Sequence, residues 1–210
     1  MHATPRPHDL LWGMTPEQLL ADAPEWARQM LATGQPVVVR RALTAVGQIA
    51  VGLRGTSRDQ RYATVMDVGR VLRCVSPEQL IETLPSSELP AFKALAAIKP
   101  FLDDLGRSWG VTGSVGYQLA TGLPTAHADS DLDLLLLVPC ELPRHEAHEL
   151  QRLLDQACCR VDMQLETPAG AVALREWAGA ASRVLLKCPS GARLVGNPWR
   201  DSLDQPELVA

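Results

Sequence analysis

The sequence feature that most constrains the fold is a pair of aspartates at the start of an apolar run. The segment Ser-Asp-Leu-Asp at residues 130–133 leads directly into five apolar residues, 134–138. On a β-strand, side chains alternate between faces, so Asp131 and Asp133 share one side and Leu132 takes the other. Two neighbouring carboxylates repel each other unless a cation compensates them. The pattern therefore predicts a strand on which Asp131 and Asp133 bind a divalent metal ion.

A second constraint lies upstream, at Gly113-Ser114. A short apolar run precedes this pair, and a helix-like segment, residues 115–121, follows it. We expect a strand, a tight turn and the first turn of a helix, where exposed backbone N–H groups favour an anion such as phosphate. Gly113 and Ser114 are therefore the predicted phosphate-binding residues.

A third acid lies on a segment that alternates strictly. Apolar residues stand at 161, 163 and 165, and Asp162 begins the polar face of the same segment. If this strand pairs beside residues 131–138, Asp162 joins Asp131 and Asp133, and three carboxylates can hold two Mg²⁺ ions, with Mn²⁺ as the alternative. Asp162 would be a metal ligand or the base that takes a proton from an attacking hydroxyl. The structural alternative is an ordinary strand with one solvated face.

Charge is distributed unevenly along the 210 residues. Residues 35–75 contain seven arginines and two aspartates, whereas residues 103–176 contain twelve acids and five arginines. The basic part could meet phosphates or an acidic protein, and the acidic part suits a metal; two solvated surfaces are the alternative. Arg54, Arg58 and Arg61 flank one predicted turn, and guanidinium groups suit phosphate because each offers a planar fork of donors.

Periodicity divides the chain into two domains joined by the Pro- and Ser-containing residues 84–90. The first, residues 1–84, is predicted to be a basic α+β domain with a helix within residues 15–34 and a small, largely antiparallel sheet. Its strands are expected at residues 36–40, 48–54 and 60–66, and residues 68–75 are expected to continue as a strand or short helix. In the second, residues 90–210, we expect a helix over 91–105 that bends or breaks at Pro100. Further strands are expected at 109–113, 131–138, 160–166, 183–188 and 193–195, and helices at 115–121, 143–157 and 171–178. The predicted fold class is α+β, with a mixed sheet that carries helices on one face.

Several other polar residues could be functional or could simply lie on the surface. His145 and His148 are three residues apart rather than the four that a zinc-binding helix requires, so we expect them on its solvated side. His127 could touch a phosphate, and Lys187 could neutralise pyrophosphate, but both could equally be surface residues. His8 and Asp9, beside the apolar residues 10–12, could belong to a site, but a lone histidine near a terminus is more often simply exposed. No Walker A or G-x-S-x-G motif is present, so Ser114 is not expected to be a nucleophile.

The cellular setting is predicted from cysteines and hydropathy. Five cysteines are present without a C-x-x-C pair, and Cys158 and Cys159 are adjacent, so reduced thiols are expected. The N-terminal residues lack a signal-peptide layout, and no apolar run approaches the length of a membrane span. We therefore expect a cytoplasmic protein without a membrane partner.

The three acids and the Gly-Ser turn resemble the nucleotidyltransferase superfamily of the DNA polymerase β type. Longer blocks look like the phosphoribosyl-dephospho-CoA transferase of malonate decarboxylase, a holo-acyl-carrier-protein synthase. They are residues 6–12 (RPHDLLW), 36–41 (PVVVRR), 110–116 (GVTGSVG), 119–122 (LATG), 130–134 (SDLDL) and 162–168 (DMQLETP).

The resemblance implies a nucleotidyltransferase-like catalytic domain and a particular reaction. A serine of the acyl carrier subunit of malonate decarboxylase would attack 2′-(5″-triphosphoribosyl)-3′-dephospho-CoA and release pyrophosphate. Such carriers are typically acidic, which gives the arginine-rich first domain a docking or phosphate-binding role. We expect no nucleic-acid partner. Two alternatives stay open: a nucleotidyltransferase with another acceptor, and a non-catalytic module that binds a carrier protein.

Overall fold

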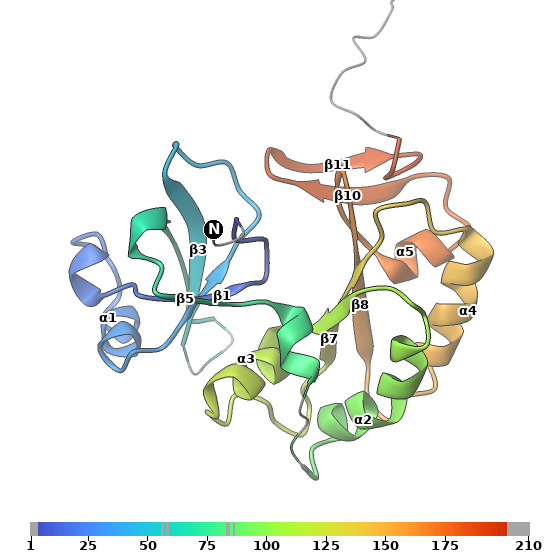
Figure 1. The fold of residues 1–210 in the computed structure, drawn as a ribbon, viewed down its shortest axis with the longest axis horizontal. Coiled ribbons are helices and arrows are strands. Elements are labelled where there is room, and N and C mark those ends of the chain that lie inside the picture. Colours follow the sequence, from blue (N-terminus) through green and yellow to red (C-terminus); the bar gives the residue numbers. More distant parts are fainter. Residues whose placement is uncertain (1–3, 56, 58, 83–84, 86, 201–210) are drawn as a thin grey trace, which may run out of the picture. The chain divides into compact units, whose positions relative to one another are not determined.

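The computed structural model describes residues 4–55, 57, 59–82, 85 and 87–200 (Figure 1). Its contacts divide the chain into two compact units, each built from two segments. The first unit holds residues 1–87 and 110–127, and the second holds 88–109 and 128–210. Arg58 of the predicted arginine cluster and Leu84 and Ser86 of the predicted linker lie outside the described residues. The division at residues 84–90 stays a prediction.

The first unit contains a five-stranded antiparallel sheet in the order β4-β3-β2-β1-β5. The three predicted strands are confirmed, and β5 lies within residues 68–75, which were predicted as strand or short helix. β1, which the sequence did not predict, completes the sheet and gains its partners only from β2 and β5, which lie far away in the sequence. The strands are β1 (Leu10–Trp12), β2 (Val37–Val39), β3 (Gln48–Arg54), β4 (Arg61–Asp67) and β5 (Arg73–Val75).

The helical region before β2 is broken into two pieces. Thr15 and Gln18 form a capping box, but it starts only the 3₁₀ helix η1 (Pro16–Gln18), and α1 (Glu25–Ala32) begins after Pro24. The predicted single helix is therefore too long, because Pro24 lacks an N–H and disfavours helical geometry in the residue before it. Gly34 adopts φ +75° and ends the segment, as predicted.

Alternate strand residues of the first sheet form its core. Leu11, Val37, Val51 and Leu53 are almost completely buried, and they lie in one cluster with Ala27 of α1. Two further 3₁₀ helices flank β5, namely η2 (Val68–Arg70) and η3 (Pro77–Ile81).

The second sheet is mixed and has the order β11-β10-β9-β8-β7-β6. β7 and β8 are parallel, and β8 to β11 are paired antiparallel. The predicted helix at residues 171–178 is wrong in its first half, because Ala171 and Val172 are buried and pair with β8. The strands are β6 (Trp109–Val111), β7 (Leu132–Leu137), β8 (Val161–Thr167), β9 (Gly170–Ala173), β10 (Val184–Cys188) and β11 (Gly191–Val195).

The helices of the second unit are α2 (Pro90–Asp103), α4 (Arg144–Leu154) and α5 (Leu174–Ala178). In Figure 1, α4 and α5 lie side by side next to β8. α2 runs on through Pro100, so the expected break is absent. Pro100 lies in the last turn, where the lost hydrogen bond would have gone to the carbonyl of the exposed Ala96 and leaves no buried acceptor unsatisfied. The predicted α+β class is confirmed.

The two faces of the β7–β8 pair differ in polarity. Leu132, Leu134 and Leu136 pair with apolar residues of β8, and all of them are buried. The opposite face carries partly exposed acids.

All five cysteines are free thiols, as predicted. Across the described residues, no helix combines the length and the apolar character that crossing a bilayer requires.

Candidate active site

The predicted carboxylates lie at the start of β7 and β8. The parallel register sets Asp133 directly opposite Asp162, and Asp131 precedes β7 by one residue. Residues paired in register point to the same face of a sheet, and neighbouring strands lie about 4.8 Å apart. Asp133 and Asp162 are partly exposed and Asp131 is exposed. The second unit therefore presents acids on the polar face of its sheet.

Arg160, which directly precedes β8, lies beside these acids. Its Nε lies 3.0 Å from Oδ1 of Asp162, and its Nη2 lies 3.0 Å from Oδ2. The backbone carbonyl of Arg160 accepts a hydrogen bond of 2.9 Å from the N–H of Leu132, which ties the two strand starts together. Asp162, and after it Asp131 and Asp133, raise the pKa of the Arg160 guanidinium. One cation thus lies within electrostatic reach of all three predicted catalytic acids, although the sequence analysis did not single it out.

The predicted carboxylates suit one of the ways in which proteins bind a divalent cation. Within the described part of the chain, no group of three or more His, Cys, Asp or Glu side chains converges closely enough to hold a metal ion. Mg²⁺ does not need such a cage, because proteins commonly hold it through one or two carboxylates and leave the remaining positions to substrate phosphates and water. Asp131 and Asp133 supply two carboxylates on an accessible strand start, which fits this mode of binding.

The Gly-Ser turn belongs to the first unit, where it begins α3 (Gly113–Thr121). Gly113 has φ +63°, a left-handed conformation that residues with a Cβ rarely adopt. One turn later, a Cβ on Gly116 would lie 2.6 Å from the carbonyl oxygen of Val111, so the helix packs closely on the strand before it. The first N–H groups of an α-helix have no partner within the helix, and they point towards a ligand at its N-terminus. The predicted strand, turn and helix are all present.

The loop after α3 folds back onto the helix. The hydroxyl of Thr125 donates a 2.8 Å hydrogen bond to the carbonyl of Ser114, and the N–H of Ala126 donates to Oε1 of Gln118. His127 follows the loop and is exposed. Its predicted phosphate contact stays a prediction.

The N-terminal block supports the strand that leads to the Gly-Ser turn. Arg6 donates through Nη2 to both carboxylate oxygens of Glu78, at 2.8 and 2.9 Å. The backbone of Glu78 and of the preceding Pro77 packs against Gly110, at a point where a Cβ would collide with the Pro77 carbonyl carbon. A charged pair distant in sequence therefore braces the backbone three residues before Gly113.

Asp9, one of the two N-terminal candidates, is buried, with only 4% of its surface exposed. Its Oδ2 accepts a 2.8 Å hydrogen bond from the N–H of Arg6, and the Cys74 thiol lies 3.5 Å away. Among the described residues, its Oδ1 has no hydrogen-bond partner. Burial raises the pKa of Asp9, and it also raises the pKa of Cys74, to about 11. The run of apolar residues after Asp9 was the available signal that this segment enters a sheet.

Other candidates take plainer positions. His145 and His148 are exposed on α4, as expected, and Lys187 is exposed on β10.

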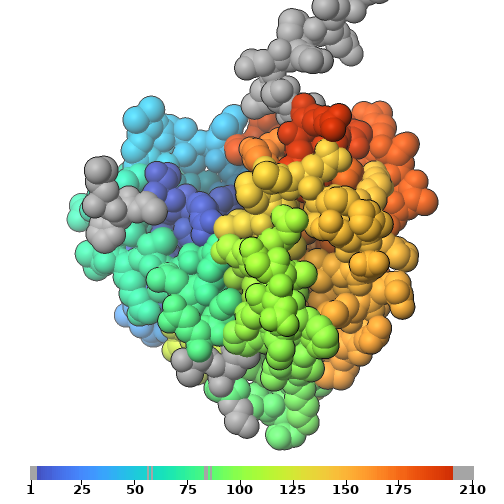
Figure 2. Space-filling model, turned by 45° about the vertical axis from the view of Figure 1, so that its right-hand side comes forward, coloured from blue at the N-terminus to red at the C-terminus, as the bar shows by residue number. Residues whose placement is uncertain are grey.

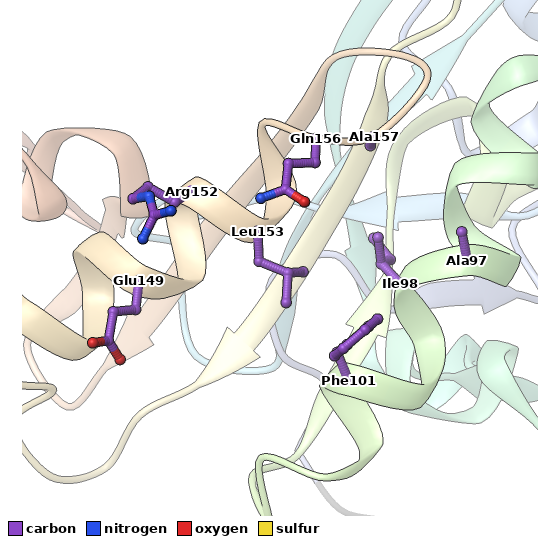
Figure 3. A pocket seen from close by; sticks show the side chains of 8 residues that line it. All are labelled: Ala97, Ile98, Phe101, Glu149, Arg152, Leu153, Gln156 and Ala157. Atoms are coloured by element: carbon purple, nitrogen blue, oxygen red, sulfur yellow. The ribbon is translucent and has the colours of Figure 1, made fainter.

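A cavity of about 400 Å³ lies between α2 and α4, which run side by side on one face of the molecule (Figures 2 and 3). It is lined by Ala97, Ile98, Phe101, Glu149, Arg152, Leu153, Gln156 and Ala157. None of the predicted site residues lines it.

Comparison with known proteins covers nearly the whole chain. Residues 6–77 match the N-terminal domain, and residues 79–198 the C-terminal domain, of the phosphoribosyl-dephospho-CoA transferase MdcG. No solved structure matches.

Three curated relatives carry the name phosphoribosyl-dephospho-CoA transferase. The protein of Pseudomonas fluorescens strain Pf-5 is 60% identical over 193 residues, covering 92% of this chain and 93% of the relative. The Azotobacter vinelandii protein is 56% identical over 209 residues, covering 96% and 99%. The Pseudomonas aeruginosa PAO1 protein is 46% identical over 200 residues, covering 94% and 95%. The resemblance found in the sequence is confirmed, and this chain belongs to the family of phosphoribosyl-dephospho-CoA transferases.

Proposed function

We propose that this protein is a metal-dependent nucleotidyltransferase that attaches the phosphoribosyl-dephospho-CoA group to an acyl carrier protein. The donor is 2′-(5″-triphosphoribosyl)-3′-dephospho-CoA, and the acceptor is a serine of the apo carrier subunit of malonate decarboxylase. The printed names of the relatives support the transferred group. The acceptor rests on the resemblance, together with the basic charge of the first unit.

The transfer is an in-line displacement at the α-phosphorus of the donor. The serine oxygen of the carrier forms a bond to this phosphorus, and the bond from phosphorus to the oxygen bridging the α- and β-phosphates breaks. That electron pair leaves with pyrophosphate, and the serine proton passes to Asp162 or to water. The carrier supplies the nucleophile, which agrees with the lack of a recognisable nucleophile motif in this chain.

Each predicted residue has a stated part in this reaction. Gly113 and Ser114 bind the donor phosphates through the N-terminus of α3. Asp131 and Asp133 hold Mg²⁺, or Mn²⁺ in its place. A bound cation of this kind neutralises charge on the phosphates and stabilises the leaving pyrophosphate. Asp162, currently paired with Arg160, accepts the proton when the hydroxyl attacks.

The observation that carries the proposal is the register of β7 and β8. It sets Asp133 opposite Asp162 on the polar face of the sheet, with Asp131 one residue before β7. Like charges opposite each other destabilise a sheet, and Arg160 compensates part of this paired charge. A divalent cation held by Asp131 and Asp133 would compensate more of it.

The test combines purified protein, donor, Mg²⁺ and a panel of acceptors. We expect pyrophosphate release in proportion to the apo carrier added, and none with a carrier whose acceptor serine is replaced by alanine. Release that depends instead on a nucleic-acid end or a small-molecule alcohol would assign the chain a different acceptor. Binding of the carrier without any release would identify a non-catalytic module.

A further inference from the structure

The outer face of the first sheet carries exposed arginines that the proposed chemistry does not use, although Leu10, Ala50 and Val75 on the same face are buried. Leu11, Val37, Val51 and Leu53 point into the core, so their strand neighbours point to the opposite side. On that side, Arg54 of β3 and Arg61 of β4 are paired in register, and both side chains are exposed.

Two further arginines extend this face across the sheet. A Cβ on Gly52 would lie 3.0 Å from the Cδ of Arg40, so the exposed Arg40 side chain passes over β3 at the position where no side chain stands. At the other edge, the guanidinium of Arg73 lies 4.6 Å from the centroid of the Trp12 ring, its register partner. We call Arg40, Arg54, Arg61 and Arg73 the arginine face. Among the described strand residues on this side, one is acidic, namely Asp67 at the far end of β4.

The breadth of the arginine face indicates the size of its ligand. It runs from β4 to β5, which are separated by four strand spacings, or about 19 Å. Apolar side chains adjoin it. Val65 of β4 is 41% exposed, and beyond it the exposed Val68 is held next to the loop of Val46 by a 2.9 Å hydrogen bond from its N–H to Gly47. Arginine and an aromatic residue beside exposed apolar side chains are typical of protein interfaces rather than of a pocket for one phosphate.

We propose that the arginine face docks an acidic surface of the protein acceptor of the transfer. This inference rests on the proposed function and specifies how its partner is recognised. Four guanidinium groups complement a carboxylate-rich surface, which accelerates encounter and selects against basic partners. The arginines act in binding the acceptor and do not take part in the displacement at phosphorus.

The test compares two triple variants of the full chain. R40E/R54E/R61E reverses the face at exposed positions, and R152E/R183E/R200E makes the same charge change at exposed positions of the second unit. Isothermal titration measures binding of the apo carrier, and steady-state kinetics measure KM for carrier and donor separately. We expect the first variant to bind the carrier at least about tenfold more weakly and the control to stay within about twofold, with the difference shrinking as salt is added. The milder R40Q/R54Q/R61Q should show the same trend if charge reversal disturbs folding.

The outcomes separate docking from chemistry. Wild-type affinity in the reversed variant, or no carrier binding by the wild type, overturns the docking proposal. A rise in KM for the donor rather than the carrier also overturns it, because the face would then be a phosphate site. If the wild type binds the carrier through this face but never modifies it, docking stands and the proposed function fails.

Discussion

Asp133 is the residue on which the proposed chemistry depends most. It lies within the strand, opposite Asp162, whereas Asp131 lies just before it. Asp133→Asn keeps the shape of the side chain but removes half of the paired negative charge that attracts a cation. We expect transfer to fall by at least about a hundredfold, as when one electrostatic contact to a transition state is lost, with only part of the loss recovered at high Mg²⁺.

The matched control for this prediction lies on the same face of β8. Glu166→Gln removes a charge at the opposite end of the strand, where Glu166 accepts a 2.9 Å hydrogen bond from Gln164. Initial rates of pyrophosphate release measure both variants. Equal losses in the two would show that general charge, and not the site at the strand start, governs the rate.

Gly113 tests the phosphate-binding role of the turn. Gly113 (φ +63°) and Gly122 (φ +75°) lie at the two ends of α3, and both have left-handed backbones. Alanine at either position should cost about 1–2 kcal/mol of folding free energy. We expect similar losses in denaturant melts, but a raised KM for the donor only in Gly113→Ala. An unchanged donor KM in Gly113→Ala would argue against phosphate binding at this turn.

Asp9 gives a prediction about pH. Burial raises its pKa above the ordinary value of 3.8, so the folded state favours the protonated form. The contribution of Asp9 to stability is therefore largest below the unfolded-state pKa and falls as pH rises towards the folded-state pKa. Asp9→Asn can still accept the Arg6 N–H, and it does not ionise. Its melting temperature relative to wild type should rise as the pH increases above the ordinary carboxyl pKa of 3.8. A difference that stays constant with pH would contradict this account.

At the scale of elements, the start of β8 brings the guanidinium of Arg160 close to the predicted acids. Arg160 and Asp162 stand two residues apart, and their pair is largely accessible, with the two side chains 63% and 39% exposed. Such exposed pairs contribute only about 0–1 kcal/mol to stability, so removal of the guanidinium should leave the fold intact. Arg160→Gln should lower the Mg²⁺ concentration needed for half-maximal transfer, because a positive charge that acts on Asp131 and Asp133 is removed.

The control for Arg160 is a second arginine pair in the same unit. Arg175 contacts Asp155 at 2.8 Å on the helical side of the fold. Arg175→Gln should leave the Mg²⁺ dependence unchanged, and metal titration of the initial rate measures both. A higher Mg²⁺ requirement in Arg160→Gln would indicate that the guanidinium helps to bind substrate instead of competing with the metal.

Elements with a clear local pattern were predictable. The alternating β8 and the Gly-Ser start of α3 appear where the sequence places them, because burial of alternate residues and a left-handed glycine act locally. β1 and β9 were not predictable, since three or four apolar residues become strands only through partners supplied elsewhere in the chain. Pro100 does not break α2, because a proline in the last turn of a helix removes few backbone hydrogen bonds.

At the scale of the whole molecule, the predicted metal-binding and phosphate-binding residues belong to different units. The acids belong to the second unit, and Gly113 and Ser114 belong to the first. Their positions along the chain were predictable from spacing, but Arg160 was not, because a single arginine beside an acid on a strand is common on any surface. The arginine face was predictable only as an excess of charge, and its location required the register of β3 and β4.

The most direct test of the account is the intact mass of the apo carrier after incubation with this protein, Mg²⁺ and the triphosphoribosyl donor. The account predicts that the carrier gains the mass of one phosphoribosyl-dephospho-CoA group, and that chelation of the metal or Asp133→Asn prevents the gain. A carrier of unchanged mass beside folded wild-type protein, or an equal gain with Asp133→Asn, would contradict it.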